Sequence, residues 1–383
     1  MNRLNQLTEI HQSGKPYIIY KSKKGFNLYT NFSKKIILNN KNIKSFLTKK
    51  NKKKSKDTDL FIGFFGYELL NNLIDVKIPK QKNLNFPKGI FYKPEKKIKL
   101  SNKLNYDFEN FKSGNFKINI NRKNYTKIFN KFKKKIKSGE TYQIKICTKY
   151  KTKSKINPLD FFSRLSNTNL APEAFMIKDD NYSIISCSPE TLITKKGSDI
   201  STKPIAGTVK KTKHLNKMKA LNYFRKNLKE TKEHNMIVDM ERNDLSRICK
   251  VGTVKLSKQK IVEEYKDLFH YVSLIKGKLK KNINNFEIIK AMMPGGSVIG
   301  CPKINTLNLL NNQEKENRNI YTGSFGYIKF NGDMRFNIII RSILNFKNIS
   351  EISVASGVVV DSNANHEFNE NFLKAKALSL IHI

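Results

Sequence analysis

Two acidic segments that lie far apart in the sequence have the residue types and spacing of a divalent metal site. Near the C-terminus, Glu367, Glu370 and Lys374 are spaced i, i+3 and i+7, so on a helix they share one face. Glu233 falls on the apolar stripe of a predicted helix, where a carboxylate is costly to bury unless it pairs with a cation. Because Mg²⁺ prefers carboxylate oxygens, the two segments together predict a Mg²⁺ site. Each segment alone also fits a solvated helix face with ion pairs.

Other polar groups stand on apolar or glycine-rich segments and are candidates for proton transfer or anion binding. His270, in LFHYVSLIKG, is a candidate general acid, although a single His in a strand also fits a satisfied core group. Arg341, in FNIIIRSI, carries a planar guanidinium that suits a carboxylate. The segment PGGSVIGCPK at 294–303 either presents backbone amides and the Lys303 ammonium to an anion or forms a tight surface turn.

The elements that must position these groups are strands in runs with helices between them. Alternation of apolar and polar residues predicts strands at 141–150, 182–188, 190–196, 322–330, 336–346 and 352–360. Helical spacing predicts helices at 124–140, 221–248 and 366–381. The first of these helices should end at Gly139, directly after a lysine-rich last turn. This mixture predicts an α+β protein.

The length of 383 residues fits one large or two ordinary domains. Residues 92–117 are polar and weakly patterned, so we expect them to connect an N-terminal lobe, 1–118, to a catalytic domain, 119–383. No stretch approaches the roughly 18 consecutive apolar residues that a membrane helix needs. The N-terminus has no apolar run after its charges, as a secretory signal would. We therefore expect no membrane association and a cytoplasmic location.

The net charge of +43 raises the question of nucleic-acid binding. The lysines are spread along most of the chain together with abundant Asn and Ile, a pattern typical of a coding sequence rich in A and T. Only residues 51–59 and 133–137 are dense basic runs, and no nucleic-acid-binding module is recognisable. We expect no nucleic-acid partner, whereas small anionic substrates would be attracted. A basic nucleic-acid-binding protein on a degenerate scaffold is the non-enzyme alternative.

The order of motifs along the chain resembles the chorismate-binding enzyme family. The motifs are KPIAGT at 203–208, EHNMIVDMERNDLSRI, HYVSLIKG, PGGSVIGCPK, YTGSFGYIKF, FNIIIRSI, and ASGVVVDSN followed by HEFNE. The resemblance is strong over residues 121–383, and GFFGYELL at 63–70 extends it weakly toward the N-terminus. This family includes the large subunits of anthranilate synthase and aminodeoxychorismate synthase, and the isochorismate and salicylate synthases. The resemblance implies a two-lobed fold of β-sheets packed face to face with helices outside.

The resemblance also implies that chorismate and Mg²⁺ lie in a cleft between the lobes. His270 would help the ring hydroxyl to leave, and Arg341 with Tyr321 would bind the enolpyruvyl carboxylate. The positions that match the family's site are, for the metal, Glu233, Glu367 and Glu370; for catalysis, His270, Thr208 and Lys303; and for substrate binding, Ala206, Gly207, Gly296, Tyr321, Gly323, Arg341, Gly357 and Lys374.

Residues that differ between branches of the family bear on the reaction. Gln143 stands where the isochorismate and salicylate synthases carry a lysine that activates water, so the resemblance implies ammonia as the nucleophile. Ala206, in PIAGT, resembles anthranilate synthases and removes the lysine of the PIKGT motif. Ser297, in PGGS, and Ser324, in TGSFGY, resemble aminodeoxychorismate synthases. We expect component I of aminodeoxychorismate synthase, with anthranilate synthase as the alternative.

The source of ammonia is a further expectation from the resemblance. A glutaminase with a Cys–His–Glu site would need a domain of its own, and no such glutamine-hydrolysing module is visible in the chain. We therefore expect ammonia from a separate glutaminase subunit. If amination occurs with Ala206 in place of the lysine, either ammonia attacks without a covalent lysine step or water fills the space of the missing side chain.

Overall fold

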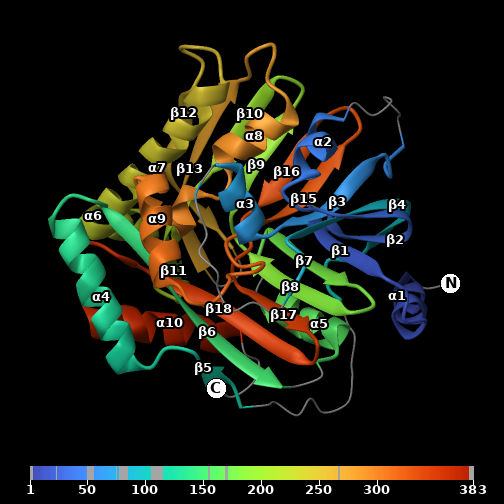
Figure 1. The fold of residues 1–383 in the computed structure, drawn as a ribbon, viewed down its shortest axis with the longest axis horizontal. Helices are drawn as coiled ribbons and strands as arrows, with labels where there is room; N and C mark the ends of the chain where they lie inside the picture. Colours follow the sequence, from blue (N-terminus) through green and yellow to red (C-terminus); the bar gives the residue numbers. More distant parts are fainter. Residues whose placement is uncertain are drawn as a thin grey trace.

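The strands of the protein form one continuous antiparallel ladder, seen in a computed structural model (Figure 1). The structure describes residues 3–22, 24–49, 56–74, 76, 85–104, 115–153, 156–168, 171–265 and 268–378. In order of pairing, the first half of the ladder contains β5 (Lys117–Ile118), β6 (Gln143–Lys153), β18 (Ile349–Val358), β17 (Ser342–Phe346), β8 (Tyr182–Ser188), β7 (Glu173–Lys178), β1 (Tyr17–Ser22) and β2 (Gly25–Ile37). The short β14 (Gly300–Cys301) also pairs with β6.

The second half of the ladder continues from the long strand β2. In order of pairing it contains β4 (Gly89–Leu100), β3 (Leu60–Phe65), β15 (Ser324–Lys329), β16 (Met334–Asn337), β9 (Thr191–Lys196), β10 (Asp199–Lys203) and β13 (Leu268–Lys278). Both β11 (Ile205–Lys210) and β12 (Lys255–Glu264) then pair with β13.

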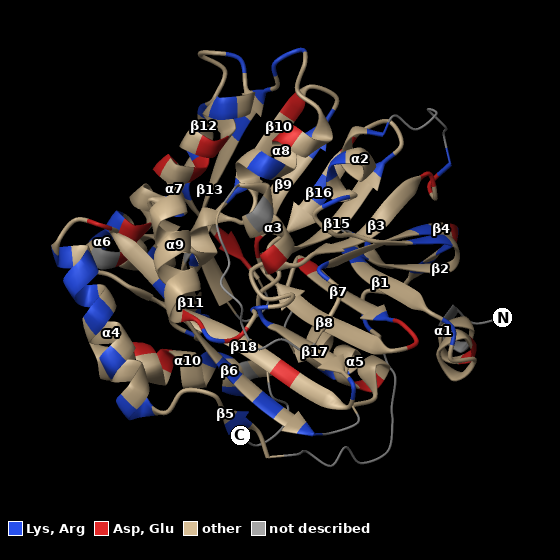
Figure 2. Cartoon of the chain, viewed as in Figure 1, with Lys and Arg blue, Asp and Glu red and all other residues tan. Residues whose placement is uncertain are grey.

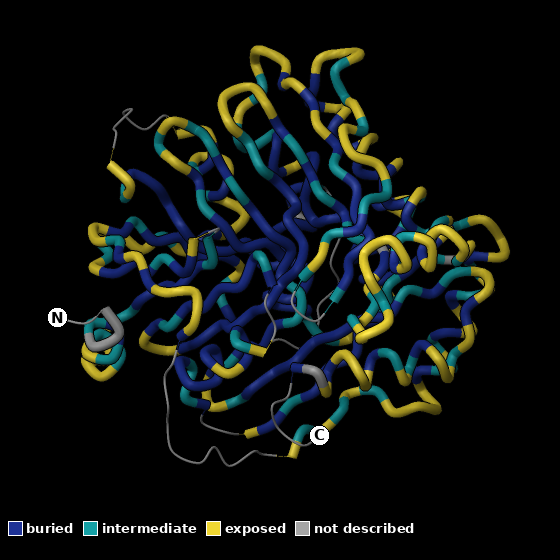
Figure 3. Tube along the Cα trace, turned by 180° about the vertical axis from the view of Figure 1, so that it is seen from behind, coloured by how far each residue is buried: buried dark blue, intermediate teal, exposed yellow. Residues whose placement is uncertain are grey.

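An apolar core rich in aromatic residues joins the two halves face to face. Phe175 of β7 stacks on Phe325 of β15, with ring centroids 3.7 Å apart and an angle of 7° between the rings. Tyr20 of β1 packs edge-on against the same Phe325 at 5.1 Å. These rings belong to one buried cluster to which both halves of the ladder contribute. Burial of such large aromatic side chains contributes strongly to the stability of a core, and Figure 3 shows that the central strands are buried.

The helices lie outside the ladder and cover its outer faces (Figure 1). They are α1 (Arg3–Gln12), α2 (Ile43–Thr48), α3 (Tyr67–Leu73), α4 (Arg122–Lys137), α5 (Pro158–Thr168), α6 (Lys217–Lys226), α7 (Leu228–Ile248), α8 (Asn285–Met292), α9 (Lys303–Gln313) and α10 (Ala364–Leu378), with a 3₁₀ turn η1 (Gly296–Val298). The arrangement confirms the predicted α+β fold. Among the described helices, none has the length and apolar content needed to cross a membrane.

The predicted stop of the first helix at Gly139 is confirmed for α4, which begins two residues earlier than predicted, and the prediction of one helix over 221–248 is wrong. In α4, the Asn121 side chain accepts the Asn124 N–H, and Gly139 follows the last turn with a φ of +78°. The segment 221–248 forms parts of two helices, α6 and α7, instead of one. They separate at Asn227, whose side chain caps α7 by accepting the Glu230 N–H. Asn is a favourable N-cap, so it starts a new helix here.

The prediction of a single strand over 336–346 is also wrong. β16 pairs with β9 and β15 in the second half of the ladder, whereas β17 pairs with β8 and β18 in the first half. The chain crosses between the two halves in the residues that separate β16 from β17. Arg341 ends this crossing with a φ of +49°, a conformation that a residue with a side chain seldom adopts. The interruption places Arg341 between the halves and outside a regular strand.

The segment 92–117, expected to be a connection, is partly strand. Residues up to Leu100 belong to β4, which pairs with both β2 and β3, and residues 105–114 lie outside the described residues. Strands from each side of the expected lobe boundary pair with one another, because β1 pairs with β7 and β3 with β15. The boundary at residue 118 stays a prediction.

Candidate active site

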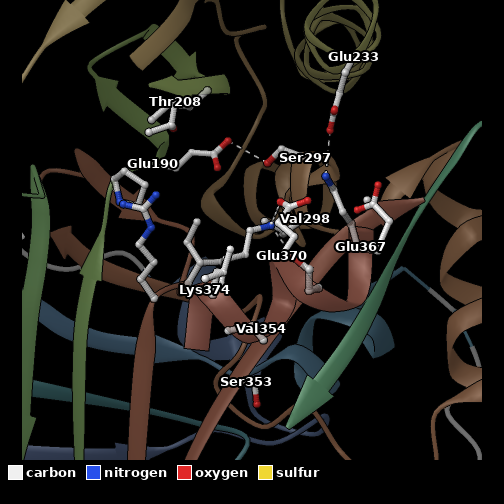
Figure 4. A pocket seen from close by; sticks show the side chains of 18 of the residues that line it. Glu190, Thr208, Glu233, Ser297, Val298, Ser353, Val354, Glu367, Glu370 and Lys374 are labelled. Carbon is white, nitrogen blue, oxygen red and sulfur yellow. Dashed lines mark hydrogen bonds and ion pairs between the residues drawn. The ribbon is translucent and has the colours of Figure 1, made fainter. Parts of the chain in front are cut away.

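A cavity of about 690 Å³ lies where α7, α10 and β18 come together, and Figure 4 shows its lining. The wall contains polar groups from segments that are distant in the sequence. Of the predicted site residues, those that line the cavity are Thr208, Glu233, Tyr321, Arg341, Gly357, Glu367, Glu370 and Lys374. Lys145, Glu190 and Ser297 also line it. Ser297 belongs to the glycine-rich segment that was expected near the site, whereas no site role was expected for Lys145 or Glu190.

Carboxylates face one another across this cavity. Glu233 points in from α7, and Glu367 and Glu370 approach from α10 on the opposite side (Figure 4). The ligand atoms of His366, Glu367 and Glu370 lie within 4.8 Å of one another, whereas Glu233 is not part of that close group in the described structure. Hard carboxylate oxygens are the donors that Mg²⁺ prefers, so this donor set fits that ion.

Lys145 is a cation in the cavity wall that the sequence analysis missed. Its Nζ lies 3.1 Å from Glu233 Oε1, and the Gln143 amide Nε2 donates to the same oxygen at 2.6 Å. Burial acts to lower the pKa of Lys145, but the carboxylates of Glu233, Glu370 and Glu367 outweigh it, and the pKa is raised. Side chains two residues apart on a strand point to the same side, so the position of Gln143 already contained this signal.

Glu190 is a second missed residue, located in the turn between β8 and β9. Its carboxyl group is buried in the cavity wall, where the Ser297 hydroxyl donates a hydrogen bond to Glu190 Oε1 at 2.9 Å (Figure 4). Burial raises the pKa of Glu190 to about 7, although the hydrogen bond from Ser297 acts in the opposite direction. A carboxyl group with such a pKa can hold or release a proton near neutral pH.

His270 supports the site from behind Thr208. The two residues are paired across β13 and β11, and His270 Nδ1 lies 2.8 Å from Thr208 Oγ1. Thr208 lines the cavity, whereas His270 is buried and is not among the described residues that form the wall. Burial, followed by the positive charge of Arg341, lowers the pKa of His270 to about 4. The imidazole is therefore neutral at pH 7.

Arg341 and Lys374 provide positive charge for an anionic ligand. No described residue forms a hydrogen bond or ion pair with the Arg341 guanidinium, which lines the cavity. Lys374 Nζ lies 2.6 Å from Glu370 and donates to the Ala355 carbonyl at 2.9 Å. An unpaired guanidinium in a partly buried wall, held by a backbone in a sparsely populated conformation, is suited to a carboxylate ligand.

Lys303 and several predicted glycines lie outside the cavity lining of the described structure. Lys303 is buried and forms an ion pair with Asp244 of α7. The glycines allow close packing: a Cβ at Gly207 would lie 2.6 Å from the Phe224 ring, and one at Gly323 would overlap the Phe65 carbonyl. The side chain of Ala206, in β11, is outside the described part of the structure.

The glycine-rich segment 294–303 shapes the cavity in a different way from that expected. Ser297 and Val298 of η1 form part of the wall. A Cβ at Gly296 would overlap the Met240 side chain, and one at Gly300, whose φ is +130°, would overlap the Gln143 carbonyl. Gly296 therefore brings η1 against α7, and Gly300 brings β14 against β6, while Ser297 and Val298 face the cavity.

Comparisons with known proteins show the family to which this chain belongs. The family model described as chorismate binding enzyme matches residues 12–379. Aminodeoxychorismate synthase component 1 of Bacillus subtilis (strain 168) is 34% identical over 267 residues, covering 70% of this chain and 57% of the relative. The chain thus spans little more than half of that protein's length. The anthranilate synthase component I-like protein of Synechocystis sp. is 32% identical over 346 residues, which cover 83% of this chain and 71% of the relative.

Solved structures show the same fold. Anthranilate synthase component I of Streptococcus pneumoniae TIGR4 has a TM-score of 0.75 at 24% identity, covering 94% of this chain and 89% of the other. The menaquinone-specific isochorismate synthase of Escherichia coli has a TM-score of 0.73 at 15% identity, and the match covers 95% of this chain and 87% of the other. These likenesses confirm the expected α+β fold, in which β-sheets pack face to face with helices outside. Together with the family match over residues 12–379, they show that this chain belongs to the family of chorismate binding enzymes.

Proposed function

We propose that this chorismate-utilising enzyme is component I of aminodeoxychorismate synthase, converting chorismate and ammonia into 4-amino-4-deoxychorismate and water with Mg²⁺ as cofactor. The observation that carries the proposal is the contact of Ser297 with Glu190 in the cavity wall. Ser297 is one of the residues that resemble the aminodeoxychorismate branch, and here it directly contacts an ionisable group of the site. The relative named aminodeoxychorismate synthase, at 34% identity, is consistent with this choice.

Charge in the cavity matches a substrate with two carboxylates. Glu233, Glu367 and Glu370 would hold Mg²⁺, which when bound would polarise the ring carboxylate of chorismate. Arg341, with Tyr321 beside it in the wall, would bind the enolpyruvyl carboxylate. Lys374 would add positive charge near both groups.

Glu190 is our candidate for the proton donor. Hydroxide is a poor leaving group, so the ring hydroxyl must take a proton and leave as water while the attacking ammonia loses a proton. With a pKa of about 7, Glu190 is substantially protonated at neutral pH. His270, whose pKa is about 4, is almost entirely neutral there and contacts Thr208 instead of the cavity. These observations favour Glu190 over His270, which the sequence analysis had proposed as the acid.

Anthranilate synthase is the second candidate, because Ala206 in PIAGT resembles that branch. Incubation with chorismate, Mg²⁺ and ammonium, followed by separation of the products, distinguishes the two. We expect a product that yields para-aminobenzoate only after a lyase for 4-amino-4-deoxychorismate is added. Fluorescent anthranilate formed without the lyase would show that the alternative is correct.

A separate glutaminase subunit is proposed as the physiological source of ammonia. We expect free ammonium salts to support turnover at higher concentration and glutamine alone to support none. Adding the purified glutaminase subunit should restore turnover with glutamine. Turnover of glutamine by this chain alone would contradict the proposed partner.

A further inference from the structure

We propose that the Lys145 ammonium competes with the divalent cation for Glu233 and thereby weakens metal binding in the absence of substrate. This inference rests on the metal site of the proposed function and concerns how strongly that site holds its ion. Lys145 is not one of the residues that the family resemblance assigned to the site. Its position, its charge and the shape of the wall around it carry the argument.

The first observation is that Lys145 contacts the metal-facing carboxylate directly. Its Nζ lies 3.1 Å from Glu233 Oε1, and both side chains are largely buried, with 16% and 20% exposure. An ion pair in a sheltered site is less screened than one on the surface, so this contact competes effectively with a second cation.

The second observation is that the wall has space for this ammonium. Gly357 of β18 is the cross-strand partner of Lys145 on β6. A Cβ at Gly357 would lie 2.6 Å from Lys145 Nζ and 3.3 Å from its Cδ. The lysine therefore occupies space that any other residue at position 357 would take, and its ammonium is held on the cavity side of the sheet.

Repulsion between the Lys145 ammonium and a divalent ion should lower the affinity of Glu233 for the metal. A divalent ion bound to Glu233 would lie a few ångströms from the ammonium, where repulsion between the two cations is strong. The ammonium must leave Glu233 before the metal can use that carboxylate fully. Metal affinity is consequently reduced by the free energy needed to break the ion pair.

The test measures Mn²⁺ binding without chorismate, following free Mn²⁺ by electron paramagnetic resonance. We expect Lys145→Met to bind Mn²⁺ at least about tenfold more tightly than the wild type, because a nearby positive charge is removed. Lys151→Met is the matched control: Lys151 also belongs to β6 but pairs with Glu316 and Glu351. It should bind Mn²⁺ as the wild type does. Lys145→Arg, which keeps the charge, should also bind as weakly as the wild type.

Two further measurements test the same inference in case the Lys145→Met variant does not fold. Lys145→Gln retains an N–H donor for Glu233 and should show the same tighter binding if Lys145→Met unfolds. In a crystal structure of the wild-type protein with Mn²⁺, Lys145 Nζ should lie beyond ion-pair distance from Glu233. Equal affinities of the wild type and both uncharged variants, or a metal bound beside an intact ion pair, would overturn the inference while the metal site stands. If no form bound Mn²⁺, the metal part of the proposed function would fail as well.

Discussion

Glu190 and Arg341 show how individual residues obtain their properties from their surroundings. Glu190 has a raised pKa because it is buried, and Ser297 partly offsets that effect through a hydrogen bond. Arg341 keeps its charge available because no described side chain pairs with it. The proposed proton donor and the proposed anion-binding group therefore line one cavity, and each role can be tested separately.

Replacement of Glu190 by Gln should lower kcat by about 100-fold, because it removes the proposed general acid while preserving its shape. A general acid acts only when protonated, so the wild-type rate should fall as the pH rises through about 7, the pKa of Glu190. In Ser297→Ala this fall should move to higher pH, since the lost hydrogen bond stabilised the charged form. A pH–rate profile checks both expectations, and an unchanged profile in Ser297→Ala would contradict the assignment.

Replacement of Arg341 by Met should raise KM for chorismate by about tenfold or more with little change in thermal stability, since the proposed substrate contact is lost, whereas no hydrogen bond or ion pair to a described side chain is lost. Arg335 offers a contrasting control, because it forms an ion pair with the buried Glu173. Arg335→Met should lower the free energy of unfolding by about 2 kcal/mol, because the buried carboxylate keeps its hydrogen bonds from Tyr20 and Thr191 but loses its cation. Steady-state kinetics and thermal unfolding separate the two effects. A lower stability of Arg341→Met with unchanged KM would assign Arg341 a structural role.

At the scale of helices and strands, local sequence patterns predicted the elements that run without interruption in the structure. Alternation identified β6 and β8, and a capping Asn and a glycine stop marked α4. The capping signal at Asn227, followed by Glu230, was also present in the sequence and marks the start of α7. The break before Arg341 could not be predicted, because it arises where the chain passes between the two halves of the ladder.

The site residues were likewise predictable only where a sequence motif marked them. The family motifs located Glu233, Glu370 and Arg341, which the cavity brings together although they come from distant segments. Lys145 and Glu190 were missed because a lysine on a strand and a carboxylate in a turn usually face solvent. Only the packing of β18 against β6 and of η1 against the β8–β9 turn shows that both residues face the cavity.

The segment containing η1 provides a test at this scale. Gly300→Ala should lower the free energy of unfolding by about 3 kcal/mol, since a Cβ would meet the Gln143 carbonyl and its φ of +130° favours glycine. Gly296→Ala should cost less, about 1 kcal/mol, because the Met240 side chain that it meets is flexible. Urea unfolding of both variants measures the difference. Equal costs would contradict the packing described for this segment.

At the scale of the whole molecule, basic residues stand on many helices and strands of the described structure (Figure 2). Figure 2 shows Lys and Arg along α4 and on many other elements, and the net charge of the chain is +43. Such a field raises the rate at which an anionic substrate reaches the cavity and is screened by salt. Charge at this scale thus affects association with the substrate more than it affects the fold.

Raising the ionic strength from about 0.05 to about 0.3 M should therefore lower kcat/KM for chorismate several-fold, with most of the change in KM. Parallel measurements in sucrose control for effects of the solute on stability. A kcat/KM that does not depend on salt would contradict the role given to the field. Salt-sensitive retention on heparin by a protein that turns over no chorismate would instead support the nucleic-acid-binding alternative.

We propose that Glu233 of α7 and Glu370 of α10, which are far apart in the sequence, hold one divalent ion that binds chorismate. The most direct measurement is Mg²⁺-dependent consumption of chorismate with ammonium by Glu233→Ala and Glu370→Ala. Glu95→Gln serves as the control, since Glu95 pairs with Lys93 on β4 and is not part of the cavity lining in the described structure. We predict that both alanine variants lose at least about 100-fold in rate while the control keeps the wild-type rate. Wild-type consumption by either alanine variant would contradict the account.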